Sequence, residues 1–202
     1  MDGYVLVKLN EMLQELGEDR VRTILSSFSC PLNSDVEYFL CRRAIEFAKQ
    51  KIAPTTLVFC SYKEQLELVG YFTLTIKDFC VYKNRMSGAL RRKISKYGVL
   101  DRERDAYMIP APLIAQLGKN YTGNLNKLIT GDELLKMAVD RVALIQQDIG
   151  GKVVYIECEN KPKLLEFYDR NGFCIFGKRL LDRDEKERMT GNELIQMLKV
   201  IT

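Results

Sequence analysis

The fold is decided by residues 152–176, which read KVVYIECENKPKLLEFYDRNGFCIF. The run 152–158 is rich in β-branched and aromatic side chains and predicts a strand. Residues 162–170 begin with proline and predict a short helix, Asn171-Gly172 predicts a turn, and 173–176 predict a second strand. This spacing is typical of a βαβ unit, so we expect the two strands to be parallel, with a right-handed crossover.

Another strand and helix precede this unit. Residues 113–117 predict a strand, 118–130 are rich in turn residues, and 131–147 predict a helix that Gly150-Gly151 ends. The helix begins with the capping box TGDE (130–133), in which side chains satisfy free backbone amides. The sequence therefore predicts a polar loop between the end of a strand and the start of a helix.

An antiparallel hairpin is predicted further upstream. Residues 55–62 and 66–75 are rich in β-branched and aromatic side chains, and only 63–65 separate them. The sheet is then mixed, with an antiparallel hairpin at one side and a parallel pair at the other. The expected fold class is α/β, an α+β arrangement with a mixed sheet and helices on both faces.

The two ends of the chain carry helical patterns. Residues 10–16 and 18–28 predict helices, and 34–48 predict a third that opens with the capping box SDVE. Another capping box, TGNE (190–193), predicts a short C-terminal helix.

Length and composition suit one globular domain. The chain has 202 residues, of which 47% are hydrophobic and 29% charged. We expect a single domain over 1–202, with a helical extension at 1–27 and a helical tail at 180–202. The sequence contains no apolar run of about 18 residues and begins with no secretory signal pattern. A cytoplasmic protein is therefore expected.

The chain contains no histidine. This absence excludes a Ser-His-Asp or Cys-His triad, zinc sites that need imidazole, and a histidine pH switch. In an enzyme of this composition, protons must move through tyrosine, carboxylate, lysine, thiolate or water.

Six cysteines are scattered along the chain without a C-x-x-C pair: Cys30, Cys41, Cys60, Cys80, Cys158 and Cys174. Most lie in apolar runs, which indicates small buried side chains in a reducing cytosol. A disulfide framework or a metal site is the alternative.

Net charge is only +4, but basic residues are concentrated in one run without an acidic residue: Lys83, Arg85, Arg91, Arg92, Lys93 and Lys96. Residues 87–96 also predict a helix, and 101–105 a polar turn. The basic run is either a solvated helix face or an electrostatic footprint for phosphates.

The loop before the helix at 131 has the composition of a phosphate site. Residues 119–131 contain two glycines, three asparagines and two lysines. A helix N-terminus presents free amides and a positive dipole end to an anion. The alternative is a plain connecting loop, and the acidic residues Asp132 and Glu133 oppose a phosphate at this position.

These motifs together resemble a known family. A strand that ends at Asn160, a helix with Leu164 and Phe167-Tyr168, and then Asn171-Gly172-Phe173 resembles the second acyl-CoA-binding motif of the GCN5-related N-acetyltransferases. Residues 113–135 resemble the strand, loop and helix that carry the pyrophosphate motif of that family. The order of elements matches the family fold from about residue 28 to 178.

A weaker resemblance to toxin-type members of the family lies upstream. It rests on FSCPLN (28–33), Phe39-Leu40, the strand at 55–58 and GYFTL (70–74). The toxin-type enzymes acetylate the amino group of aminoacyl-tRNA, and similar proteins occur in phages and mobile elements. The pyrophosphate loop departs from the family pattern, since Asn126 and Ile129 stand where Gln or Arg and a glycine are usual.

The resemblance implies acetyl-CoA as co-substrate and no metal. Pantetheine is then expected to pair with the main chain of the strand that bears the loop, and pyrophosphate to lie on the amides that follow. Asn160 either bonds the pantetheine amides or caps the following helix. The implied cofactor-binding residues are Leu117, Gly118, Lys119, Lys127, Thr130, Gly131, Asp132 and Asn160.

The resemblance also implies that the amine attacks the thioester directly, with Tyr168 as the general acid that protonates the CoA thiolate. The alternative for Tyr168 is a core tyrosine. Glu157 or Glu159 is a weak candidate for the base, only one of the two is expected to face the cleft, and water is the alternative.

Two classes of function follow. The first is an acetyl-CoA-dependent N-acetyltransferase, a monomer or homodimer, whose acceptor is a small amine, a protein or an RNA-linked amine held by the basic run. The second is an eroded scaffold of the same superfamily that binds nucleic acid or a protein.

Overall fold

A computed structural model describes residues 3–85, 87–88, 91–92, 95–183, 185–189 and 191–201, with the backbone alone at Arg85. Contacts divide the chain into two compact units. Unit 1 comprises Met1–Thr75 and Ala115–Ala138, and unit 2 comprises Ile76–Ile114 and Val139–Thr202. The single domain expected over 1–202 stays a prediction.

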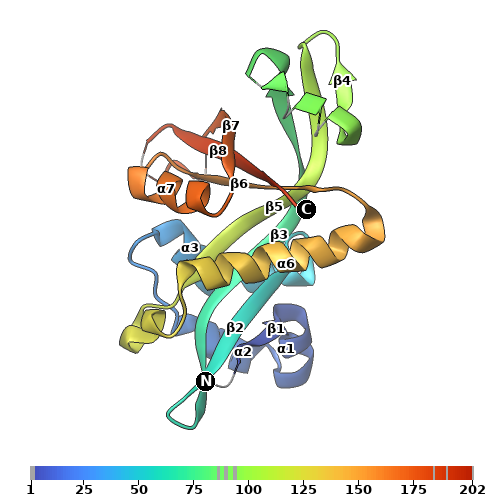
Figure 1. Cartoon of the computed structure of the whole chain (residues 1–202). Coiled ribbons are helices and arrows are strands. Elements are labelled where there is room, and N and C mark those ends of the chain that lie inside the picture. Colours follow the sequence, from blue (N-terminus) through green and yellow to red (C-terminus); the bar gives the residue numbers. More distant parts are fainter. Residues whose placement is uncertain are drawn as a thin grey trace. The chain divides into compact units, whose positions relative to one another are not determined.

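The elements follow one another as Figure 1 shows. The strands are β1 (Val5–Lys8), β2 (Thr55–Tyr62), β3 (Gln65–Tyr82), β4 (Val99–Asp101), β5 (Ala106–Lys119), β6 (Val153–Glu159), β7 (Cys174–Leu180) and β8 (Glu193–Val200). The α-helices are α1 (Leu9–Leu16), α2 (Glu18–Ser26), α3 (Ser34–Tyr38), α4 (Ala44–Lys49), α6 (Gly131–Ile149) and α7 (Pro162–Arg170). A π-helical turn, η1 (Phe39–Arg43), joins α3 to α4, and short 3₁₀ turns are η2 (Lys83–Arg85), η3 (Ser95–Tyr97) and η4 (Thr122–Lys127).

The predicted mixed sheet is confirmed. Its hydrogen-bonded order is β1-β2-β3-β5-β6-β8-β7, with β4 paired to β5. β2 and β3 form the expected antiparallel hairpin. The parallel pair is β5 with β6 and not the predicted β6 with β7, because β8 lies between those two strands. The α/β fold class therefore holds, although β5 is longer at both ends than the strand predicted at 113–117.

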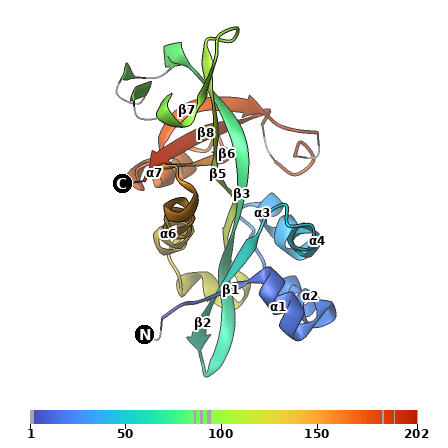
Figure 2. The ribbon, with the colours of Figure 1, turned by 90° about the vertical axis from the view of Figure 1, so that its right-hand side faces the viewer.

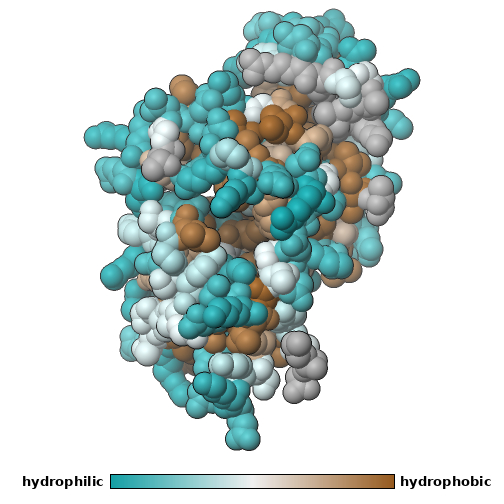
Figure 3. All heavy atoms as spheres, turned by 60° about the vertical axis from the view of Figure 1, so that its left-hand side comes forward, coloured by the Kyte–Doolittle hydropathy of each residue, from teal (hydrophilic) through white to brown (hydrophobic). Residues whose placement is uncertain are grey.

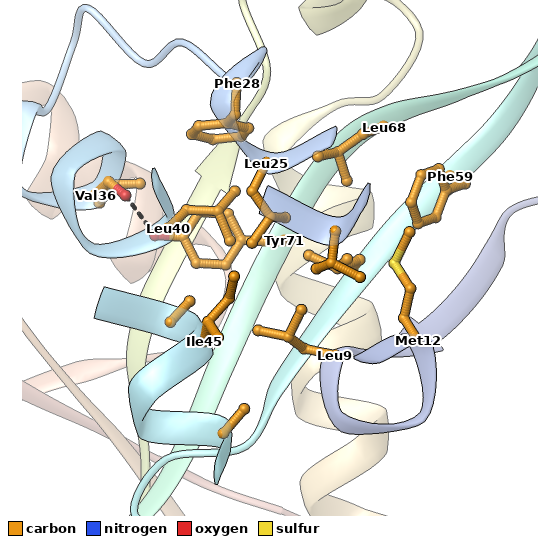
Figure 4. Close-up of a cluster of buried hydrophobic side chains, with 14 of the residues drawn as sticks. Leu9, Met12, Leu25, Phe28, Val36, Leu40, Ile45, Phe59, Leu68 and Tyr71 are labelled. Atoms are coloured by element: carbon orange, nitrogen blue, oxygen red, sulfur yellow. Dashed lines mark hydrogen bonds between the residues drawn. The ribbon is translucent and has the colours of Figure 1, made fainter. Parts of the chain in front are cut away.

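In unit 1, helices cover both faces of the hairpin. Figure 2 shows α1 to α4 on one face and the start of α6 on the other. Figure 4 shows the core on the first face, where Leu25 and Leu40 lie beside the fully buried ring of Tyr71 and Phe28 meets it edge-on, with the ring centroids 5.3 Å apart. The Tyr71 hydroxyl donates to the carbonyl oxygen of Val36 at 2.6 Å, so α3 is tied to β3.

The N-terminal expectations need two corrections. The chain does not begin with a helix, because β1 pairs with β2 before α1 starts. The α3 cap is Asn33 and not Ser34, because Asn33 Oδ1 accepts from the amides of Asp35 and Val36. Glu37 turns away from the cap and accepts from the Cys30 amide at 2.7 Å.

The C-terminal expectation was wrong. Residues 193–200 form the strand β8 and not a helix, and β8 pairs antiparallel with both β6 and β7. The apolar side chains of β8 are buried in unit 2, which outweighs any helical start signal. Consequently β6 and β7 run in the same direction but do not pair. Thr190, the predicted cap, lies outside the described residues.

The predicted basic helix at 87–96 lies partly outside the described residues. In the described part, the Arg91 amide donates to the Ser87 carbonyl at 3.0 Å, one helical turn, and η2 and η3 flank it. The polar residues at 101–105 connect β4 to β5 as a hairpin.

The cysteines are free, as expected. Cys30, Cys60 and Cys158 are buried, whereas Cys174 is exposed and departs from the expectation. The described residues contain no group of Cys, Asp and Glu placed to hold a metal ion. In the described ranges, no helix is long and apolar enough to span a membrane. On the face drawn in Figure 3, hydrophobic atoms form patches among hydrophilic side chains.

We expect Tyr71→Phe to lower the free energy of unfolding by about 1–2 kcal/mol, because it removes a buried hydrogen-bond donor from the Val36 carbonyl. Urea unfolding measures the change. The matched control is Tyr62→Phe, at the exposed hairpin tip, for which we expect less than about 0.5 kcal/mol. Equal losses in the two variants would contradict the role of this hydrogen bond.

Candidate active site

The predicted site residues are divided between the two units. Unit 1 holds the predicted cofactor loop, with Leu117, Gly118, Lys119, Lys127, Thr130, Gly131 and Asp132. Unit 2 holds Tyr168 and Asn160.

In unit 1 the loop is a compact turn. β5 ends at Lys119, η4 follows, and α6 begins at Gly131. Gly123 and Asn124 have φ values of 57° and 66°, a left-handed conformation that glycine and asparagine adopt most readily. These two residues bend the loop, and across the bend the Asn124 amide donates to the Tyr121 carbonyl at 3.3 Å.

Two side chains hold the carbonyls of this loop. Lys119 Nζ donates to the carbonyl oxygens of Asn126 at 2.8 Å and Ile129 at 3.0 Å. The Tyr4 hydroxyl, just before β1, donates to the Leu128 carbonyl at 3.0 Å. Sequence reasoning missed Tyr4, because nothing in the sequence relates the N-terminus to residue 128.

The capping box at the start of α6 is confirmed. Glu133 Oε2 accepts from the Thr130 amide at 2.8 Å, and the Glu133 amide donates to Thr130 Oγ1 at 3.1 Å. The hydrogen bond from the Thr130 amide lowers the pKa of Glu133, so its carboxylate stays charged at neutral pH. The amides of Thr130 and Glu133 are therefore occupied, and the amide of Gly131 lies between them at the helix start.

Asn120 is a second residue that sequence reasoning missed. Its side chain is buried, and Oδ1 accepts from the amides of Ser29 and Thr122, both at 3.1 Å. Its Nδ2 donates to the Leu68 carbonyl at 2.9 Å. One amide side chain thus joins β3, the segment after α2 and the start of the loop.

Two loop positions have packing explanations. A Cβ atom on Gly118 would lie 2.4 Å from Val36 Cγ1, so glycine is required here for α3 to pack against β5. Ile129 is 2% exposed, and its side chain anchors the loop in the core where the family has a glycine. Both residues shape the loop.

In unit 2, α7 places Tyr168 in a buried position. Its ring packs edge-on against Phe167 and Phe173. No described residue forms a hydrogen bond with its hydroxyl, and the hydroxyl oxygen retains some exposed surface. Burial, and then the neighbouring Cys158, raises the pKa of Tyr168 above its ordinary value, so the phenol stays protonated.

Asn160 lies at the exposed end of β6. It does not cap α7, because the cap position is Lys161 and no side chain makes the cap hydrogen bond. The alternative that assigned Asn160 to capping is therefore wrong.

The two glutamates at the end of β6 are both paired. Residues two apart on a regular strand share a face, so the expectation that only one of Glu157 and Glu159 faces a cleft is wrong. Glu157 accepts from Arg179 at 2.6 Å and from Gln196 at 2.9 Å. Glu159 is paired with Lys161 at 2.6 Å. Their carboxylates are engaged in ion pairs, which does not suit a general base.

Comparison with known proteins finds similarity at the level of structure. No protein-family model matches the chain, and no curated protein sequence matches it. The structure of AtaTR bound with acetyl-CoA is 19% identical, with a TM-score of 0.56 over 96% of this chain and 93% of that one. The structure of AtaT complexed with acetyl-methionyl-tRNA is 18% identical, with a TM-score of 0.61 over 96% and 94%. A tyrosine-to-phenylalanine mutant of KacT is 16% identical, with a TM-score of 0.59 over 95% and 93%.

These matches extend over nearly the whole chain and nearly the whole of each neighbour. The chain therefore has the fold of these proteins, a mixed α/β fold of the class that the sequence predicts.

We expect Asn120→Ala to lower the free energy of unfolding by about 2–4 kcal/mol, because it leaves the Ser29 and Thr122 amides and the Leu68 carbonyl without their side-chain partner. Amide hydrogen exchange in residues 120–130 should quicken as well. Asn160→Ala, at an exposed asparagine, is the control and should change stability by less than about 0.5 kcal/mol. An Asn120 variant as stable as this control would refute the joining role.

Proposed function

We propose that the protein is an acetyl-CoA-dependent N-acetyltransferase that moves an acetyl group directly to a primary amine. The observation that carries the proposal is the fold, which matches AtaTR bound with acetyl-CoA and AtaT bound to acetyl-methionyl-tRNA over nearly the full chain. The sequence motif around Tyr168 supports the same reading.

Unit 1 fits the pyrophosphate of CoA. An ammonium group, that of Lys119, lies within the loop, and the first turn of α6 presents the Gly131 amide and the positive end of the helix dipole. The pantetheine amides form hydrogen bonds with the main chain of Leu117 to Lys119, at the end of β5, in this proposal. Lys127, Thr130 and Asp132 border the pyrophosphate in this arrangement. Bound acetyl-CoA supplies an activated acetyl thioester.

Tyr168 supplies the proton for the leaving group. The amine nitrogen attacks the thioester carbonyl carbon, the C–N bond forms and the C–S bond breaks. The Tyr168 hydroxyl donates its proton to the departing sulfur and is reprotonated from solvent. The hydroxyl has the freedom to do so, because among the described residues it has no hydrogen-bond acceptor.

Water receives the proton of the amine. Glu157 is held by Arg179 and Gln196, and Glu159 by Lys161, so neither carboxylate is assigned as the base. Rate enhancement then rests mainly on holding amine and thioester in the reacting geometry. This chemistry needs no imidazole, which agrees with a chain that has no histidine.

The acceptor is proposed to be an amine attached to RNA. The side chains of Arg91, Arg92 and Lys96 are exposed on the basic segment, whereas Lys83 is paired with Asp105. Lys93 lies outside the described residues, and so does the side chain of Arg85. The AtaT neighbour bound to acetyl-methionyl-tRNA supports an acceptor of this class. A scaffold that binds without catalysis is the alternative, favoured by the negative charges of Asp132 and Glu133 at the helix start.

We expect Tyr168→Phe to lower kcat by about 10²–10⁴-fold, because a positioned general acid contributes that much. Affinity for acetyl-CoA and the free energy of unfolding should stay nearly unchanged, since the described residues give the hydroxyl no hydrogen bond to lose. Steady-state kinetics and calorimetry measure the two effects. Unchanged kcat in this variant would remove Tyr168 as the acid.

The pH profile gives a second readout of the same assignment. Because burial raises the pKa of Tyr168 above its ordinary value of about 10, the acid stays protonated through neutral and mildly basic pH. Turnover should rise as the amine loses its proton and should not fall again below pH of about 10. A falling limb near pH 8 that disappears in Tyr168→Phe would contradict the raised pKa.

RNA binding should weaken with salt and with loss of the basic segment. The triple change Arg91→Ala, Arg92→Ala and Lys93→Ala should flatten the dependence of log K on log salt by about one for each phosphate that the variant no longer neutralises. A control with equal charge loss, Arg20→Ala, Lys49→Ala and Lys51→Ala, should leave the slope nearly unchanged. Identical slopes in the two triple variants would exclude the basic segment as the surface that binds RNA.

A further inference from the structure

Lys119 occupies an unusual place in the loop that follows β5. Its side chain is half-buried, and Nζ lies 2.8 Å from the Asn126 carbonyl oxygen and 3.0 Å from that of Ile129. These two carbonyls lie on either side of Leu128, whose own carbonyl is held by Tyr4. A single ammonium group thus draws together the part of the loop that leads into α6.

This contact fixes the direction of peptide groups. A trans peptide is planar, with its C=O and N–H pointing in opposite directions. Because the carbonyls of Asn126 and Ile129 point at the ammonium, the amides of Lys127 and Thr130 point away from it. The Thr130 amide is bound by Glu133, and that of Lys127 faces away from the ammonium on the other side of the turn. Lys119 therefore fixes the orientation of two peptide groups of this loop, those that follow Asn126 and Ile129.

Lys119 also balances the charge at this site. The loop and the first turn of α6 carry two lysines, Lys119 and Lys127, and two carboxylates, Asp132 and Glu133. Without Lys119 the sum would be −1, and the lowered pKa of Glu133 keeps its carboxylate charged at neutral pH. An anion at the start of α6 would then meet net repulsion.

An ammonium group has three N–H donors, and the two carbonyls use two of them. We propose that Lys119 is the residue that adapts this atypical loop to a pyrophosphate: it holds the loop closed through Asn126 and Ile129 and gives its third N–H to a phosphate oxygen of CoA. This role of Lys119 rests on the proposed function and identifies the side chain that lets the loop of this chain bind the CoA pyrophosphate.

Lys127 offers a matched comparison within the same loop. Its side chain is exposed and has no hydrogen bond or ion pair to the described residues. Lys127→Met and Lys119→Met remove the same charge from the same loop, but only the second releases the two carbonyls. The difference between the variants therefore isolates the positioning role.

The test is calorimetric titration of the full chain with CoA, 3′-dephospho-CoA and pantetheine. Lys119→Met should weaken binding of the first two by about 10–100-fold, as expected for a charged hydrogen bond, and leave the weak binding of pantetheine unchanged. Lys127→Met removes the same charge but releases no carbonyl, so it should weaken CoA binding by less than Lys119→Met does. Exchange of the amides at 126–130 should quicken only in the Lys119 variant.

The outcomes separate this inference from the proposed function. Suppose that wild-type protein binds CoA. If Lys119→Met binds CoA equally well, or if its affinity for pantetheine falls as much as its affinity for CoA, the role of Lys119 is overturned and the proposed function stands. If wild-type protein binds neither CoA nor dephospho-CoA, both fail. Circular dichroism checks that each variant folds. If Lys119→Met does not fold, Lys119→Gln replaces it, because glutamine keeps a hydrogen-bond donor without the charge. The same weakening of CoA binding is expected for Lys119→Gln.

Discussion

The hydrogen bonds of Asn120 are the constraint on which the candidate site depends most. The side chain is buried and engages three separate segments of unit 1, through Ser29, Thr122 and Leu68. These contacts set where β5 ends and where the loop begins. The loop is then closed by Lys119 and Tyr4, and α6 starts with its own capping box.

Much of this fold was predictable because the deciding signals are local. The strand at β6, the helix from Pro162 to Arg170 and the capping box at Thr130 each depend on residues close in sequence, and each is present in the structure. Strand β8 was mistaken for a helix because a local start signal competes with burial against two strands, a distant interaction. Asn120 and Tyr4 were missed for the same reason, since their partners lie far along the chain.

The packing of unit 1 gives a structural reason for two residues of the loop. The assignment of Gly118 to cofactor binding stays a prediction, and the close approach of Val36 is a separate reason for a glycine at this position. Ile129 departs from the usual pattern of the pyrophosphate loop, and its buried side chain anchors the loop in the core. In both cases the packing of unit 1 accounts for a residue that a motif alone interprets through the ligand.

The central claim is that this chain holds acetyl-CoA. A thermal-shift titration of the wild-type protein tests it most directly, because a ligand that binds only the folded state stabilises it by RT ln(1 + [L]/Kd). The melting temperature should rise steadily with acetyl-CoA concentration. At 100 times Kd, bound acetyl-CoA should add about 2.7 kcal/mol to the free energy of unfolding. A melting temperature that does not change at millimolar acetyl-CoA would contradict it.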